Sequence, residues 1–240
     1  MPTIGNAHKG HPMSKSAKKE VPAKDSTKAL EIKAPRLHVL ELKIIGTAPY
    51  VQHRFSAKAI NQIIATQEAG SQAKGKKVRE PKNFDDVYQQ AMHISKDGWH
   101  GIPAGAFRNA MISACRTVGY KMTHAKLAAF VLADGFDAID GTPLVKIYGK
   151  PHRHTSHARN DNGSVDIRVR PMWDEWHAIV RVRYDADMFA DADVTNLLMR
   201  VGMQVGIGEG RPDSKNSAGL GWGTFNLDLE NIKVTVRDAA

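Results

Sequence analysis

Residues 206–223 have the sequence GIGEGRPDSKNSAGLGWG, which places six glycines in two groups of three around a basic segment. Glycine costs a folded element stability, so this density indicates either a mobile surface loop or a backbone that closely approaches another group. Arg211 and Lys215 lie between the two groups, and backbone N–H groups beside such cations suit an anion such as phosphate. Both interpretations stay open on this stretch alone.

Composition limits the classes of protein to which the 240-residue chain can belong. Hydrophobic residues make up 42% and charged residues 25%, which predicts one large domain with a real core. No run approaches the roughly 18 apolar residues that a membrane span requires. The single cysteine, Cys115, excludes an internal disulfide framework and is typical of a reducing, cytoplasmic setting. The net charge of +9 favours a polyanionic partner, although the same charge can serve solubility alone.

The chain divides into a tail and a domain. Residues 1–35 are rich in Lys, Ser, Ala and Pro and have almost no apolar periodicity, which predicts a disordered basic arm. This arm could clamp nucleic acid or remain a solvated tail. Residues 36–240 are predicted to form a single domain, with basic insertions near 56–100 and 150–164.

Periodicity predicts the order of elements in this domain. Alternating apolar residues predict strands at 37–45, 127–133, 143–149, 165–170, 177–184 and 224–229, with an edge strand at 231–237. Apolar stripes predict a helix at 102–118, which buries Cys115, and another at 191–205 with Asp191 and Asp193 as N-caps. Without insertions the order is β-α-β-β-α-β, the ferredoxin-like or RNA-recognition (RRM-like) arrangement of the α+β class. Its sheet carries two helices on one face and leaves the other free for ligands.

The strands at 165–170 and 177–184 are predicted to form a hairpin with a turn at 171–176, and this hairpin is the strongest candidate for polyanion binding. Its alternation directs Val165, Ile167 and Val169 toward the core. Four arginines would then line the opposite face, namely Arg168, Arg170, Arg181 and Arg183. A solvated sheet face is the alternative, but like charges packed together disfavour it. Aromatic residues close by in the sequence strengthen the prediction of a nucleic-acid platform.

Three further basic clusters are candidate contacts. His53 and Arg54 lie between Tyr50 and Phe55 just after the first strand, a combination that can stack a base and hold a phosphate, or simply pack as a loop. A basic loop at 70–79 contains Lys74, Lys76 and Lys77. Arg108 lies in the first turn of a helix, where it opposes the helix macrodipole unless an anion is shared.

Three histidines at 152, 154 and 157 invite a metal interpretation. No cysteine lies nearby, no helix places two of them at i and i+4, and Arg153 between them would repel a cation. A basic hairpin tip that includes Arg153 and Arg159 is therefore favoured over a metal site, and no cofactor is expected.

Two stretches together resemble a known family. Residues 102–110, IPAGAFRNA, resemble the motif that opens the first helix in the RAMP superfamily (repeat-associated mysterious proteins), and residues 219–223, GLGWG, resemble its Gly-rich loop. This superfamily includes the backbone subunits of CRISPR effector complexes and the CRISPR-RNA processing endoribonucleases. The resemblance implies a modified RNA-recognition fold that binds single-stranded nucleic acid along its backbone. It also implies a filament of stacked subunits, in which the insertions at 70–82 and 150–164 form thumb-like hairpins.

The sequence also departs from this family. Asn109 and Ala110 stand near a position where the family usually has another glycine, and the long basic arm is not typical. A divergent phage or mobile-element member, which acts on DNA as readily as on RNA, is therefore consistent with the pattern. Carried over by position, Arg108, the Gly-rich loop and the cluster after the first strand would hold the phosphates.

The expected function is non-catalytic, largely sequence-independent binding of single-stranded RNA or DNA. The expected partners, besides the nucleic acid, are further copies of the chain and other subunits of a nucleoprotein complex. The alternatives are a metal-independent endoribonuclease with His53 as general base, and a structural self-assembly protein. The candidate nucleic-acid contacts are His53, Arg54, Lys74, Lys76, Lys77, Arg108, Arg153, Arg159, Arg168, Arg170, Arg181, Arg183, Arg211, Lys215, Gly219, Gly221, Trp222 and Gly223.

Overall fold

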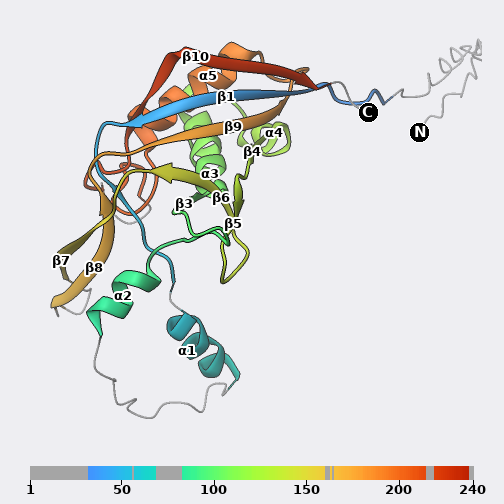
Figure 1. Cartoon of the computed structure of the whole chain (residues 1–240). Coiled ribbons are helices and arrows are strands. Elements are labelled where there is room, and N and C mark those ends of the chain that lie inside the picture. The colour runs from blue at the N-terminus through green and yellow to red at the C-terminus, as the bar shows by residue number, and fades with distance from the viewer. Residues whose placement is uncertain are drawn as a thin grey trace, which may run out of the picture. The chain divides into compact units, whose positions relative to one another are not determined.

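The computed structural model describes residues 32–55, 57–68, 83–159, 163, 165–214 and 219–237 (Figure 1). Almost all of them belong to one compact unit, which begins at Ala34. Most of the predicted arm lies outside the described residues, as do Lys74, Lys76, Lys77 and Lys215. For Arg159 only the backbone is described. No helix in the described ranges is both long and apolar enough to cross a membrane.

The unit is of the mixed α+β class with antiparallel sheets. The strands are β1 (Leu37–Gly46), β2 (Tyr50–Val51), β3 (Gly101–Pro103), β4 (Ala129–Leu132), β5 (Gly135–Phe136), β6 (Pro143–Tyr148), β7 (His152–Arg159), β8 (Val165–Trp173), β9 (His177–Asp185) and β10 (Phe225–Arg237). The helices are α1 (Ala57–Glu68), α2 (Phe84–Gln90), α3 (Ala104–Ala114), α4 (Met122–Ala128) and α5 (Asp191–Arg200), with a 3₁₀ turn at Cys115–Val118 and a π turn at Val201–Val205.

The main sheet has the strand order β10-β1-β9-β6-β3. Strand β4 also pairs with β9, further along that strand than β6 does. Strand alternation decides which face is buried: Leu40, Leu42 and Ile44 of β1 are fully buried, whereas Glu41 and Lys43 between them are partly exposed. This matches the predicted first strand and places the core on one face of the sheet.

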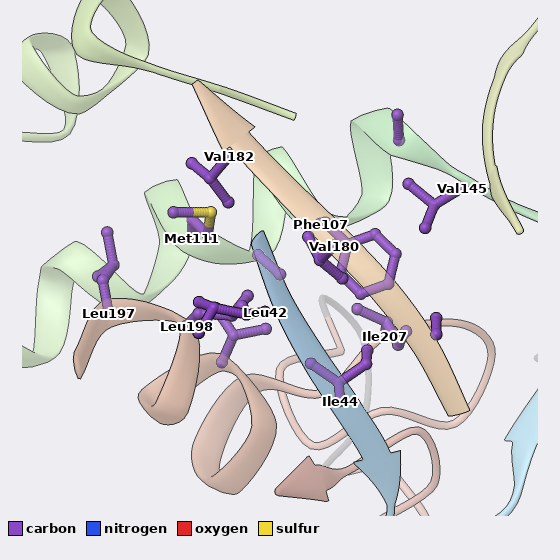
Figure 2. Close-up of a cluster of buried hydrophobic side chains, with 14 of the residues drawn as sticks. Leu42, Ile44, Phe107, Met111, Val145, Val180, Val182, Leu197, Leu198 and Ile207 are labelled. Carbon is purple, nitrogen blue, oxygen red and sulfur yellow. The ribbon is translucent and has the colours of Figure 1, made fainter. Parts of the chain in front are cut away.

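Two helical segments cover that face. Phe107 and Met111 of α3, with Leu197 and Leu198 of α5, meet the buried residues of β1 and β9 (Figure 2). Each large apolar side chain buried in this way contributes roughly 1.5–3 kcal/mol. Cys115 is buried here as expected, and burial raises the pKa of its thiol.

A second sheet, with the order β2-β8-β7, extends from the first. Strand β6 continues into β7, and β8 continues into β9, so that one long hairpin contributes its base to the main sheet and its outer part to the second sheet (Figure 1). The bend between them lies at Gly149, where a Cβ would stand 2.4 Å from the Glu175 carbonyl oxygen.

This bend overturns the predicted arginine face. Arg168 and Arg170 lie on β8 in the second sheet, whereas Arg181 and Arg183 lie on β9 in the main sheet. Val165 and Ile167 do not face the core either, because they are 60% and 44% exposed, and only Val169 is buried. Period-two alternation continues through a bend, so it could not separate the two sheets.

Smaller differences have local causes. Residues 122–128 form helix α4, in which Ala125 and Ala128 are buried at i and i+3, so the strand predicted at 127–133 is shortened to β4. Ala190 is the N-cap of α5, and Asp193 instead accepts a hydrogen bond from the Ala190 N–H. The two strands predicted at 224–229 and 231–237 form one continuous strand, β10.

Candidate nucleic-acid interface

The Gly-rich loop, residues 206–223, is closed on itself by backbone hydrogen bonds. The Ile207 N–H donates to the Gly223 carbonyl at 3.0 Å, and the N–H groups of Leu220 and Trp222 both donate to the Gly210 carbonyl. A Cβ on Gly223 would lie 1.8 Å from the Ile207 oxygen, which no side chain permits. The described glycines of this loop all have positive φ, a conformation that L residues rarely adopt. Close approach of the backbone to itself therefore requires the glycines.

The loop is also fastened to β2 and the residue before it. The Gly223 N–H donates to the Pro49 carbonyl at 2.7 Å, and the Glu209 N–H donates to the Val51 carbonyl at 2.9 Å. These internal bonds use several of the N–H groups that the sequence suggested as an anion cradle. The contribution of the loop to a site lies instead in the side chains that it holds in place.

Glu209 is the side chain on which two arginines and a histidine converge. Arg170 of β8 donates from Nε to Oε2 of Glu209 at 2.6 Å, and Nη1 of Arg168 lies 3.7 Å from Oε1. Nδ1 of His53 lies 3.7 Å from Oε2. Arg211, two residues further along the loop, donates one hydrogen bond to the Gly208 carbonyl. Arg168, Arg170 and Arg211 outnumber the carboxylates of Glu209 and of the neighbouring Asp166, so the cluster keeps a positive charge.

The charge of this cluster comes from its arginines. Burial, followed by the charge of Arg170, lowers the pKa of His53, while Glu209 acts in the opposite direction. His53 is therefore mainly neutral at pH 7, and its imidazole can accept a proton.

Two adjoining hollows open beside this cluster, and His53 and Glu209 line both. The first has a volume of about 480 Å³ and runs along β8 past Arg168 toward Phe84 of α2. The second has a volume of about 360 Å³ and lies between Arg211 and the start of α3. Volumes in this range are typical of ligand sites.

Aromatic surfaces border the cluster. Phe55 is 61% exposed, and its ring centre lies 5.5 Å from that of His53. Trp222 of the Gly-rich loop lies edge-on to His154 of β7 at 5.5 Å. Exposed rings beside arginines are the arrangement on which unpaired bases stack.

Arg54, in contrast, has a structural position. Its side chain is almost completely buried, donates two hydrogen bonds of 3.1 Å to Asp140 and lies 3.6 Å from Asp137. Although burial raises the pKa of Asp140, hydrogen bonds from Thr142 and Arg54 lower it to about 2. Arg54 thus balances interior carboxylates and does not reach the surface as a phosphate ligand.

The same network contains a possible metal set. The ligand atoms of His93, Asp137 and Asp140 lie within 4.8 Å of one another. The Arg54 guanidinium already lies against both carboxylates, and its charge opposes a second cation there. We therefore assign no metal to this cluster.

The remaining predicted contacts lie elsewhere. Arg108 donates to the carbonyls of Ala129 and Lys126 and stacks on Phe130, so it fastens α3 to the α4–β4 junction. Arg183 packs on the same ring, and Arg181 pairs with Asp134. Arg153 pairs with Asp85 of α2 at 2.6 Å.

Several charged side chains on the open face of the main sheet pair with one another. Besides the Arg181 pair, Lys43 lies 3.3 Å from Asp228, and Lys233 lies 3.4 Å from Glu41. The structure therefore brings together His53, Arg168, Arg170, Arg211 and Trp222, and it separates Arg54, Arg108, Arg153, Arg181 and Arg183 from them.

Sequence reasoning missed Glu209, His93 and Asp137. Glu209 carried a usable signal, because it is an acidic residue between two glycines in a loop whose other charged residues are mostly basic. Nothing local marked His93 and Asp137, which lie 44 residues apart and meet only in the folded chain. Compared with models of known protein families and with curated proteins, the chain matches none of them.

Proposed function

We propose that the chain binds single-stranded nucleic acid along its phosphate backbone, largely independently of base sequence and without cleaving it. The observation that carries this proposal is that Arg168 and Arg170 converge on Glu209 at one hollow, while Arg211 lines the adjoining hollow that Glu209 also borders. Arginines in this arrangement can hold consecutive phosphates, and Phe55 offers a ring for an adjacent base.

We also propose a ferredoxin-like core related to the RAMP superfamily. The order β10-β1-β9-β6, with α3 after β1 and α5 after β9, is the order that a β-α-β-β-α-β chain of this type adopts. The β7–β8 hairpin corresponds to a thumb-like insertion. On this basis we propose a cytoplasmic protein that assembles with further copies of itself along the ligand.

The test is a pair of matched arginine variants. Arg168 is about half exposed at the two adjoining hollows, which together form the candidate groove. Arg181 is similarly exposed on the open face of the main sheet, where it pairs with Asp134. Fluorescence anisotropy with a labelled single-stranded oligonucleotide should show a loss of about tenfold or more for Arg168→Ala. Arg181→Ala should change the affinity by less than about threefold. Equal losses, or no binding by the unaltered protein at low salt, would sink the proposal.

A second candidate function has its own observation in favour. His93 donates from Nδ1 to the buried Asp137 at 2.8 Å and lines the same hollow as His53. No described group bonds to its other ring nitrogen. Two imidazoles in one hollow could act as general base and general acid in RNA cleavage. If the protein cuts RNA in EDTA, and both His53→Ala and His93→Ala stop the cut, this enzyme replaces the binder; intact RNA in a retarded complex supports the binder.

A further inference from the structure

Glu209 is an anion held at the centre of a cluster that is otherwise suited to anions. Its backbone is fixed between Gly208 and Gly210, both at positive φ, and by the hydrogen bond from its N–H to Val51. Its carboxylate is held by Arg170 at 2.6 Å. The side chain therefore has little freedom to swing away when a ligand binds.

Arg170 is hydrogen-bonded to only one of the two oxygens of the Glu209 carboxylate. The Arg170 side chain is 12% exposed and requires a partner, and Oε2 of Glu209 supplies it. Among the described residues, the contact of Oε1 is with Nη1 of Arg168 at 3.7 Å, which is beyond hydrogen-bond distance. A carboxylate accepts about four hydrogen bonds, so Oε1 keeps acceptor capacity toward the two hollows that Glu209 lines.

A phosphate offers no donor to this oxygen and is repelled by it. A ligand strand can contact it only with a hydrogen-bond donor, either a base amino group or a ribose 2′-hydroxyl. Amino groups depend on the base and lie away from the backbone, whereas the 2′-hydroxyl recurs beside every phosphate of RNA. With Arg168 on one side and Arg211 on the other, phosphates at the two hollows leave the intervening sugar at Glu209.

We infer that Glu209 is the specificity-determining residue of this groove and selects RNA over DNA, because its carboxylate accepts a hydrogen bond from a ribose 2′-hydroxyl. This inference rests on the proposed function, since it requires that a strand lie in the groove. Charge-assisted hydrogen bonds are strong enough to give discrimination of about tenfold or more.

The experiment compares three oligouridylates of equal length, with a 2′-hydroxyl, a 2′-hydrogen or a 2′-fluorine. Fluorine retains an RNA-like sugar but cannot donate, so it separates hydrogen bonding from sugar shape. The unaltered protein should bind the hydroxyl form about tenfold more tightly than either of the other two. In Glu209→Gln and Glu209→Ala this preference should fall below about threefold, mainly because the deoxy form binds better without the negative charge.

Glu175→Gln is the matched control, because it removes one negative charge from an exposed turn outside both hollows, and it should keep the full preference. Circular dichroism checks that each variant folds, and the comparison on the unaltered protein holds even if a variant does not. Equal binding of the three oligonucleotides overturns the inference, and so does a preference that survives in Glu209→Ala. Equal binding of the hydroxyl and fluoro forms overturns it as well. If no oligonucleotide binds, the proposed function itself fails.

Discussion

Single glycines decide whether the Gly-rich loop can close. Gly221 and Gly223 both have positive φ, so alanine at either position costs roughly 1–2 kcal/mol for the backbone conformation alone. They differ in space: a Cβ at Gly221 meets nothing within 4 Å, whereas at Gly223 it lies 1.8 Å from the Ile207 oxygen.

We therefore expect Gly223→Ala to lower the free energy of unfolding by more than about 4 kcal/mol, and Gly221→Ala by about 1–2 kcal/mol. Urea denaturation followed by circular dichroism measures both values. Similar losses at the two positions would show that the loop does not close as described.

Asp140 makes part of the stability sensitive to acid. Its pKa is lowered from 3.8 to about 2 in the folded chain, chiefly by hydrogen bonds from Thr142 and Arg54 that outweigh burial. A carboxyl with a depressed folded pKa stabilises above its unfolded pKa and loses this contribution as the pH falls through the folded value. Urea midpoints measured across this interval should fall less steeply for Asp140→Asn than for the unaltered protein. A parallel course for both proteins would contradict the Arg54–Asp140 pairing.

At the scale of elements, the candidate site lies along the middle and the base of the β7–β8 hairpin. The 150–164 insertion was expected to form a thumb-like hairpin, but Arg170 pairs with His154 near the bend, Arg168 pairs with Ser156 near the middle of the ladder, and Val165 near the tip is exposed. Ala158 and Asp166 are ladder partners, so a two-residue Asn-Gly turn can replace residues 159–165 between them.

We expect this shortened hairpin to bind single-stranded oligonucleotides within about threefold of the full chain and to melt within a few degrees of it. Differential scanning fluorimetry and anisotropy measure the two quantities. A tenfold loss of affinity with unchanged melting would place the phosphate contacts at the tip, including Arg159.

Periodicity predicted the elements that have one buried and one exposed side, namely the strands β1 and β9 and the helices α3 and α5. The bend at Gly149 and the merger of two strands into β10 depend on contacts across the sheet, which a local pattern does not contain. For the same reason Arg168 and Arg181 looked equivalent in sequence, although they lie in different sheets.

For the whole molecule, the distribution of charge predicts how binding responds to salt. Of the three arginines at the groove, Arg170 is paired with Glu209, so Arg168 and Arg211 are left to neutralise about two phosphates at each bound protein. With about −0.7 per phosphate on a single strand, a plot of the logarithm of affinity against the logarithm of salt concentration should have a slope of about −1.4. A protein that begins at Ile32 should retain this slope, as anisotropy titrations at several salt concentrations would show. A much shallower slope after this truncation would mean that the basic arm supplies the affinity.

The sequence predicted only part of the candidate site. The basic residues were recognised along the chain, because residue types can be read from the sequence without knowledge of the fold. Which of them converge could not be predicted, since Arg170, Glu209 and His53 come from three distant segments. Several other candidates among the described residues are used in internal contacts.

The buried thiol of Cys115 also makes the chain convenient for spectroscopy. It is the only cysteine, it is inaccessible, and its pKa is raised, so a maleimide dye should react with it slowly. Leu220 is 69% exposed in the Gly-rich loop beside Trp222. A cysteine introduced by Leu220→Cys would therefore carry a dye at one defined position without removing the native thiol. The backbone hydrogen bonds from Leu220 and Trp222 to Gly210 should keep that dye at a nearly constant distance from the groove, which makes it a direct optical reporter of ligand arrival.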